Sequence, residues 1–338
     1  MESVIRQSMP LALKYVTPTE IDTYLTQLGD KAVCVVGFGM RQHAVESACP
    51  VLWVNMPVLD DGVAYEVWIS DKPVVESQNK AISGSCNEDI FFGSVFVQPD
   101  PSMHFSEVVQ RAYSDIFAFL ERSTYAHLIR VWNYFPDINA LEDGMERYRS
   151  FSIGRQEAFV RYGRKIEESP AACALGSHGG SLAIYFLAAR TPGAQIENPR
   201  QISAYHYPEQ YGPRSPAFSR ATLAFADEAP TLFISGTASI LGHETVHPGS
   251  VSLQTHETLN NIRAVIDQAG RDGFKIEDLE RGLTLKAYVR HAEHMTEVRD
   301  IICGEWGAKI QLIVVLADIC RVDLLVEIEA VCRGDSNK

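Results

Sequence analysis

The stretch Leu232-Phe233-Ile234-Ser235-Gly236-Thr237-Ala238 decides the fold, because an earlier part of the chain repeats its pattern. It is an apolar run typical of a buried strand, and it precedes a loop and an amphipathic helix around 260–266. The similar run Ile90-Phe91-Phe92-Gly93-Ser94-Val95-Phe96 precedes a loop and a helix around 114–120, which lies 146 residues before its counterpart. Similarity at a fixed spacing indicates a structural repeat.

Both copies of this repeat continue in the same order, which we predict to be β–α–β–α–β. The later elements of the two copies are strands over 128–135 and 283–289, helices around 141–160 and 294–306, and closing strands over 181–188 and 323–330. The first ninety residues have the pattern of strands joined by turns, and the polar segment 71–89 has that of a linker. The chain is therefore expected to form a three-part assembly of two repeats and a strand-rich N-terminal third.

The composition excludes two classes of partner. Lys and Arg total 30 against 43 Asp and Glu, a net charge of −13, and so acidic a chain is a poor general binder of nucleic acid. We expect no membrane partner either, because no run approaches the roughly 18 apolar residues of a spanning helix. The seven cysteines form no C-x-x-C pair, and the N-terminal segment lacks the apolar run of a signal peptide, so we expect reduced thiols in the cytoplasm.

One motif suggests a metal. His243-Glu244-Thr245-Val246-His247 matches H-E-x-x-H, which binds zinc when a helix places both histidines on one face. Gly242 precedes the motif, Pro248-Gly249 follows it, and two of its residues are β-branched. This context favours a strand-to-loop segment, so we expect no metal site and keep a zinc hydrolase as an alternative.

Arginine and tyrosine gather in the middle of this acidic chain. Tyr148 and Arg155 are seven residues apart, which places them on one face of a predicted helix. Arginine forks bind carboxylates in bidentate fashion and tyrosine hydroxyls add hydrogen bonds, so the group predicts a pocket for a small dicarboxylate. The alternative is that many of these arginines solvate a helix face. The candidates are Arg130, Arg147, Arg149, Arg155, Arg161, Arg164, Tyr205, Tyr207, Tyr211, Arg214 and Arg220.

The C-terminal strand carries two carboxylates within an apolar run. Glu327 and Glu329 are two residues apart, so both point to the same face of the strand. Burial raises the pKa of a carboxyl group, and a neutral carboxylic acid is a usable proton donor near neutral pH. These residues therefore predict a site. The alternative is an edge strand with both side chains in water.

Two parts of the last repeat resemble the RidA (YjgF) family. They are the strand over 231–236 with its following helix, and the ending Leu325-Val326-Glu327-Ile328-Glu329-Ala330. The resemblance implies a small sheet with helices on one face, assembled as a trimer, and a cleft lined by Glu327. The family has a Gly-Pro-Tyr segment where this chain has Gly212-Pro213-Arg214, and a cleft arginine where it has Leu312. These departures argue against the imine-hydrolysing activity of that family.

Nearly the whole chain resembles the chorismatases. The segments that carry this resemblance are long and unusual, and they lie at 132–136, 147–155, 203–208 and 210–214. That family is monomeric with pseudo-threefold symmetry, related to RidA proteins and to trimeric chorismate mutases. We therefore expect an α+β fold of pseudo-threefold RidA/YjgF-like sheets, as in trimeric chorismate mutases, with helices packed on one face. Residues 1–195 would hold the strand-rich third and the first repeat (about 90–190), and 196–338 a RidA-like domain with the catalytic glutamate.

The resemblance implies that the substrate is chorismate, that its enolpyruvyl group leaves as pyruvate, and that no metal or organic cofactor is needed. Glu327 would protonate the methylene carbon of the enol ether, and its carboxylate would then stabilise the oxocarbenium ion. Arginines and tyrosines would hold the two substrate carboxylates. The residues expected to bind the substrate are Tyr148, Arg155, Tyr205, Tyr211, Arg214, Arg220 and Gly236.

The family contains subtypes that form different products. One hydrolyses the ether to a dihydroxycyclohexadiene carboxylate, one forms 3-hydroxybenzoate by internal attack of the ring hydroxyl through an arene oxide, and one forms 3- and 4-hydroxybenzoate together. A Gly/Ala position and a Cys/Val position seven residues before the catalytic glutamate distinguish them, and here these are Gly236 and Cys320. With Glu327 and Cys320 as its catalytic residues, the chain is expected to be a 3-hydroxybenzoate synthase. The other two subtypes and a RidA-type imine deaminase stay open.

Overall fold

The computed structural model describes residues 11–40, 45, 47–60, 62–79, 81–98, 100, 102–225 and 229–335. The expectation that the N-terminus lacks a signal peptide concerns mainly residues 1–10, which lie outside the described residues. No helix in the described part of the chain is long and apolar enough to cross a membrane.

Three sheets are built from three sets of four strands, which we call the N-terminal, middle and last copies. The N-terminal copy contains β1 (Ala12–Val16), β2 (Ala32–Phe38), β3 (Val51–Val54) and β4 (Tyr65–Ile69). The middle copy contains β7 (Ile90–Val97), β8 (His127–Pro136), β11 (Ala171–Ser177) and β12 (Leu182–Ala189). The last copy contains β15 (Thr231–Ala238), β18 (Leu283–Val289), β19 (Gln311–Leu316) and β20 (Val326–Arg333).

The three copies share one strand order and one set of directions. The N-terminal sheet has the order β1-β4-β2-β3, with β4 antiparallel to both neighbours and β2 parallel to β3. The same pattern recurs as β7-β12-β8-β11 and as β15-β20-β18-β19. The N-terminal third, for which the sequence predicted only strands and turns, is therefore a third copy of the repeat.

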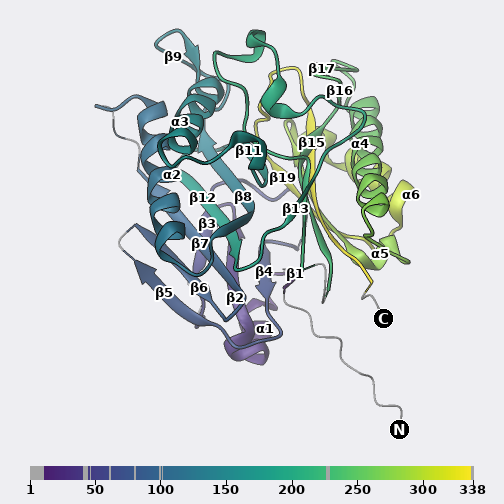
Figure 1. Cartoon of the computed structure of the whole chain (residues 1–338). Helices are drawn as coiled ribbons and strands as arrows, with labels where there is room; N and C mark the ends of the chain where they lie inside the picture. The colour runs from purple at the N-terminus through teal and green to yellow at the C-terminus, as the bar shows by residue number, and fades with distance from the viewer. Residues whose placement is uncertain are drawn as a thin grey trace.

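Helices cover one face of each sheet. The helices are α1 (Ile21–Leu28) on the N-terminal sheet, α2 (Phe105–Arg122) and α3 (Arg147–Arg161) on the middle sheet, and α4 (Val251–Arg271) and α6 (Met295–Trp306) on the last. Figure 1 shows α1 at the bottom, α2 and α3 on the left and α4 and α6 on the right, with the strands between them. This arrangement confirms the predicted α+β fold of three similar sheets with helices on one face.

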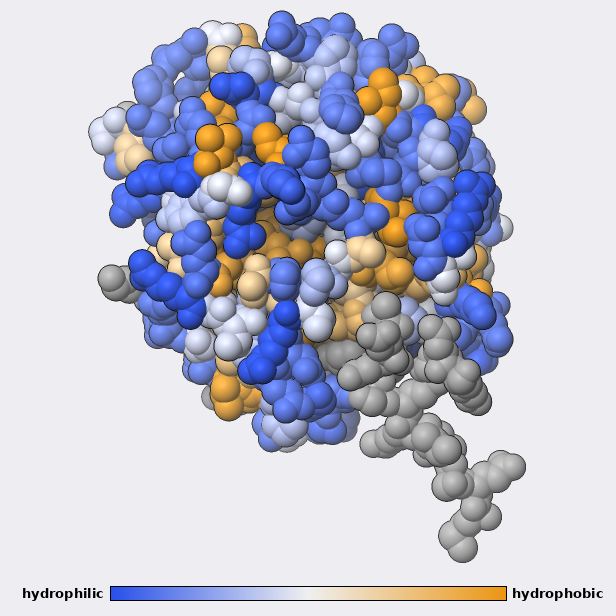
Figure 2. Space-filling model, viewed as in Figure 1, coloured by the Kyte–Doolittle hydropathy of each residue, from blue (hydrophilic) through white to orange (hydrophobic). Residues whose placement is uncertain are grey.

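The alternation of side chains along the strands separates the outer cores from a central one. On β12, Ile184 and Phe186 contact the apolar side chains of α2, whereas Tyr185 and Leu187 face a central cluster drawn from all three sheets. On β20 the apolar residues likewise pack toward α4 and α6, which leaves the glutamates of this strand on the central face. On the face drawn in Figure 2, hydrophilic residues cover most of the surface, and hydrophobic residues form one group near the middle and smaller groups toward the edges.

Several predicted elements need correction. The segment 71–89 is no linker, since it forms β5 (Val75–Asn79) and β6 (Ile82–Cys86), which extend the middle sheet beyond β7. β5 pairs through its backbone at a sheet edge and is mostly exposed, so it carries no apolar signal. The parallel edge strands β11 and β19 were also missing from the predicted order. α3 begins six residues late, because β9 (Leu141–Glu142) and β10 (Met145–Glu146) form a hairpin first.

The remaining elements belong to the last copy and frame the site described below. Two strands, β13 (Ala194–Ile196) and β14 (Ala221–Ala224), extend the last sheet beyond β15. A small hairpin of β16 (Ile240–Leu241) and β17 (Glu244–Thr245) follows β15, and the short helix α5 (Leu279–Gly282) precedes β18. The closing strand β20 begins at Val326, three residues later than expected, because a turn occupies the preceding segment.

Candidate active site

A cavity of about 410 Å³ opens between the middle and last copies. Its wall is formed by the first turn of α3, the loop between β13 and β14, strand β15, the β16–β17 hairpin and the segment before β20. A smaller hollow of about 40 Å³ continues it inward between α3, β11 and β15. Both are lined by Tyr148, Pro216, Phe218, Gly236, Cys320 and Glu327. One chain therefore builds this site from two of its copies.

Glu327 is a buried carboxyl group at the inner end of the cavity. Its side chain faces both hollows, the residue is 4% exposed, and the Cys320 Sγ lies 4.0 Å from its Oε2. Burial and the charge of Glu329 raise the pKa of Glu327 to about 8, against the opposing charges of Arg130 and Arg220. Glu327 is therefore protonated at neutral pH and can act as an acid.

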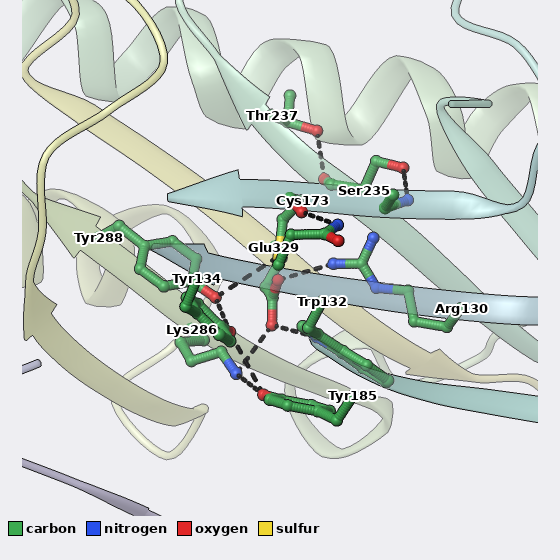
Figure 3. Close-up of polar contacts among 12 residues, drawn as sticks. Arg130, Trp132, Tyr134, Cys173, Tyr185, Ser235, Thr237, Lys286, Tyr288 and Glu329 are labelled. Atoms are coloured by element: carbon green, nitrogen blue, oxygen red, sulfur yellow. Dashed lines mark hydrogen bonds and ion pairs between the residues drawn. The ribbon is translucent and has the colours of Figure 1, made fainter. Parts of the chain in front are cut away.

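Glu329, two residues further along β20, is held in the opposite state. Its Oε2 accepts a 2.6 Å bond from Arg130, and its Oε1 lies 3.0 Å from the Lys286 Nζ and accepts a 2.9 Å bond from Trp132 (Figure 3). Burial alone would raise the pKa of Glu329, but Lys286 and Arg130 outweigh it and lower that pKa. The edge-strand alternative is wrong, because β20 lies between β15 and β18 and both glutamates are buried.

A bulge in β15 makes room for the Glu327 carboxyl group. The register between β15 and β20 shifts between Ile234 and Thr237, and Gly236 lies in this irregular step. A Cβ at Gly236 would lie 1.9 Å from the Oε1 of Glu327, so only glycine fits beside the carboxyl group as it stands. The bulge is fixed by Ser235, whose Oγ accepts a 2.9 Å bond from the Ala172 amide and donates to a carbonyl of the neighbouring loop.

Helix α3 brings an arginine into the inner hollow. Gly154 lets α3 lie against α2, since a Cβ there would be 2.0 Å from the Ser106 carbonyl oxygen. Tyr148 and Arg155 then face the same hollow, as their spacing predicted. Arg155 is 3% exposed, and its Nε and Nη2 have no hydrogen-bond partner. Buried N–H groups without partners are costly, and a carboxylate ligand would satisfy them.

Further cations surround the outer cavity. The Nη2 of Arg220 donates to the Tyr207 hydroxyl at 2.9 Å, while its Nε is buried without a partner. The guanidinium of Arg321 stacks 4.0 Å above the Tyr211 ring and donates to the His243 carbonyl at 2.9 Å. Arg149 also lines the wall. Cations at the inner and outer ends of one cavity suit a ligand with two carboxylates.

The structure brings together seven of the nine predicted site residues, which line the two hollows: Tyr148, Arg155, Tyr211, Arg220, Gly236, Cys320 and Glu327. It does not bring in Tyr205, which packs against His206 at 4.6 Å between ring centroids, or Arg214, which is exposed. Both residues lie in the irregular loop between β13 and β14: Tyr205 is in a short 3-10 turn, and Arg214 follows Gly212, whose φ of 140° bends the chain.

The sequence did not predict one cation that lines the cavity. Arg321 lies outside the predicted helices of the two repeats and outside the arginine-rich region. The only feature of the sequence that pointed to it is its position next to Cys320. Tyr207 and Arg149 also line the cavity; both belong to the arginine- and tyrosine-rich set, but not to the residues expected to bind the substrate. Proximity along the chain could not rank them, because the cavity is formed by the contact of two copies.

The structure argues against the two weaker alternatives. The H-E-x-x-H motif lies on the β16–β17 hairpin, as its context predicted, and the Nδ1 of His243 lies 3.2 Å from the Tyr211 hydroxyl. Within the described ranges, no group of three or more His, Cys, Asp and Glu side chains could hold a metal ion. Leu312, at the position of the RidA cleft arginine, lies on β19 and packs against the helix-side core of the last copy.

Comparisons with known proteins agree with this geometry. Residues 66–188 match the family model described as chorismatase FkbO/Hyg5-like, N-terminal. A 3-hydroxybenzoate synthase from Streptomyces hygroscopicus is 39% identical over 292 residues, which is 83% of this chain and 85% of that protein. The chain belongs to the chorismatase family. A second Streptomyces hygroscopicus relative, named chorismatase, is 36% identical over 87% of this chain and 86% of its own length.

A solved member of the chorismatase family shares the whole architecture. The crystal structure of a chorismatase at 1.08 Å resolution superposes with a TM-score of 0.87 at 32% identity, covering 97% of this chain and 99% of that one. The relation therefore extends over the N-terminal, middle and last copies alike.

Proposed function

We propose that this chorismatase converts chorismate into pyruvate and 3-hydroxybenzoate, with Glu327 as the acid. One observation carries the proposal: a buried carboxyl group, whose pKa is raised to about 8, faces a cavity in which arginine N–H groups lack partners. Chorismate has two carboxylates for these cations and an enol ether that needs a proton. The names of the relatives, 3-hydroxybenzoate synthase and chorismatase, support the same substrate.

In the proposed reaction, Glu327 gives its proton to the methylene carbon of the enolpyruvyl group. The electron pair of the double bond forms the new C–H bond, and an oxocarbenium ion remains beside the Glu327 carboxylate, which stabilises it. The ring hydroxyl then attacks the ring carbon that carries the ether, and the C–O bond breaks with its electron pair moving to pyruvate. The hydroxyl proton returns to Glu327. The resulting arene oxide opens and loses a ring proton, so the two products account for every atom of chorismate.

Control of water decides between this route and hydrolysis. Gly236 and Cys320 flank the Glu327 carboxyl group, and the inner hollow of about 40 Å³ is lined mainly by apolar side chains. A ring hydroxyl already held in place has a large advantage over a free nucleophile, because its attack is intramolecular. The same two residues carry the pattern of the 3-hydroxybenzoate subtype. A hydrolytic enzyme, which would consume one water, is the second candidate.

We also propose that the active unit is a monomer in a reducing compartment, which we take to be the cytoplasm. The cavity takes its lining from the middle and last copies of one chain, so no second chain is needed to complete it. All seven cysteines lie in described parts of the chain and are free thiols. Light scattering during gel filtration tests the monomer, for which a mass near 37.6 kDa is expected.

The purified protein incubated with chorismate in ¹⁸O-labelled water tests the function. Pyruvate and 3-hydroxybenzoate should form in equal amounts, and the hydroxybenzoate should contain no solvent oxygen. The matched variants are Glu327→Gln, which should lose pyruvate release, and Glu257→Gln, which changes a part-buried carboxylate on α4 paired with Arg200 and should keep it. A dihydroxycyclohexadiene carboxylate as the main product would favour the hydrolytic enzyme, and no pyruvate at all would reject both.

A further inference from the structure

Four buried charges meet where the three copies contact one another. They are Glu66 on β4, Arg130 on β8, Lys286 on β18 and Glu329 on β20, each at most 6% exposed. The Lys286 Nζ lies 2.5 Å from the Glu66 Oε2 and 3.0 Å from the Glu329 Oε1, and Arg130 bonds the other oxygen of Glu329. Figure 3 shows Lys286 and Arg130 reaching Glu329 from its two sides.

This group of four, the central charge cluster, is balanced. Two carboxylates face two cations, and Glu66 also accepts a 2.6 Å bond from Trp68 and lies 3.4 Å from the Tyr185 hydroxyl. Burial alone would lower the pKa of Lys286, but Glu329 and Glu66 outweigh it and raise that pKa. Each charge thus has an opposite charge in contact, and Glu327 is left as a fifth ionisable group without a cation of its own.

The other groups around Glu327 are either neutral or cations that form no ion pair with it among the described residues. The neutral ones are Tyr148 on α3, Cys173 on β11, Tyr288 on β18 and Cys320, and burial raises the pKa of each. The cations on the cavity side are Arg155 and Arg220, with Arg321 further out. Of the two cations on the cluster side, Lys286 divides its charge between Glu329 and Glu66.

We propose that Glu66, which lies in the N-terminal copy, is a positioning residue of the reaction: it balances the second cation of the central charge cluster, so that Glu327 keeps its proton until the substrate takes it. The proposal rests on the proposed role of Glu327 as the acid. It also gives the N-terminal copy a part in the chemistry, although none of its described residues lines the cavity.

The sign of the effect follows from charge balance. Glu66→Gln leaves two cations facing one carboxylate, and the excess positive charge favours the ionised form of Glu327. In general, removing a unit charge at a distance of about 10 Å, in a medium with an effective dielectric constant of about 20, changes a pKa by about one pH unit, and this sets the scale of the expected shift. The basic limb of the kcat–pH profile should therefore move down by about one pH unit, while kcat well below that limb stays within about twofold of wild type.

Four variants separate this electrostatic role from a structural one. Glu66→Asp keeps the charge and should leave the limb in place. Glu66→Gln combined with Lys286→Met removes one charge of each sign, so the limb should return to its wild-type pH. Glu257→Gln is the matched control, since it removes a carboxylate that pairs with Arg200 and does not belong to the central charge cluster. It should not move the limb. A structural role would lower kcat at every pH and would make the double variant worse than the single one.

A second readout works without turnover. Infrared spectra of the protein without substrate follow the carboxylic C=O band that Glu327→Gln abolishes, and this band should disappear at a lower pH in Glu66→Gln. An unmoved band and limb in Glu66→Gln would overturn the proposal, as would a double variant shifted as far as the single one. If Glu66→Gln does not fold, Lys286→Met decides with the opposite sign: it leaves two carboxylates facing one cation, so the band and the limb should move to higher pH, and an unmoved limb would overturn the proposal. A shifted band with an unchanged kcat–pH profile would support the effect of Glu66 on the ionisation of Glu327 but would reject Glu327 as the acid.

Discussion

Replacing Gly236 with alanine tests how closely the Glu327 carboxyl group must be placed. The added methyl carbon would lie 1.9 Å from the Oε1 of Glu327, whereas real Cβ contacts are essentially never below 3.0 Å, so the carboxyl group must move by at least about 1 Å. The Cδ of the same carboxyl group would lie 2.9 Å from the added carbon, and the Cβ of Cys173, at 3.0 Å, is already at the limit of a normal contact. A misplacement of about 1 Å costs on the order of 10²-fold in rate, or about 2.7 kcal/mol of barrier.

The assay is the initial rate of pyruvate release at saturating chorismate, with chromatography of the aromatic products and a thermal melt of each protein. The matched control is Gly304→Ala on α6, where a Cβ would meet nothing within 4 Å, and it should retain the wild-type rate. The melting temperature of Gly236→Ala should change little, because the displaced atoms are the end of one flexible side chain. A Gly236→Ala enzyme within threefold of the wild-type rate would refute the reasoning that the carboxyl position limits turnover.

Five further experiments have expected outcomes. Burial and Glu329 raise the pKa of Glu327 to about 8, and its protonated form is the active one, so kcat should be level below that pH and fall tenfold per pH unit above it. Glu327→Gln should release pyruvate about 10²–10⁴-fold more slowly. It should also melt at a higher temperature than wild type at pH 8, because the raised pKa of Glu327 makes the wild-type chain take up a proton on folding, which costs stability at this pH, whereas glutamine takes up none. Arg155→Ala should raise KM about tenfold or more, whereas Arg214→Ala, outside the cavity, should not. Cys320→Val with Gly236→Ala should divert the remaining flux to the dihydroxycyclohexadiene carboxylate; a double variant that still forms only 3-hydroxybenzoate would contradict this. A chelator should leave the wild-type rate unchanged, and a chelator-sensitive rate would contradict that expectation.

The sequence by itself determined the repeat and the chemistry of its last strand. Apolar runs at 90–96 and 232–238 with similar helices behind them were enough to predict two copies, because alternation and helical periodicity are local properties of the chain. The spacing of Glu327 and Glu329 placed both on one face of a strand for the same reason. The N-terminal copy was not predicted from the sequence, since its sheet has the shared strand order but only one α-helix among the described residues.

Only the tertiary structure decided what the two glutamates do. Both stand on one strand in the same apolar run, yet Glu329 contacts Lys286 and Arg130 while Glu327 has neither, and these partners come from strands far away in the sequence. The choice between Arg155 in the cavity and Arg214 on the surface was likewise made by the packing of α3 and by the turns of one loop. Electrostatic energies depend on distance and burial in space, so a pattern along the chain can predict that a carboxylate is buried, but not which charge it will meet.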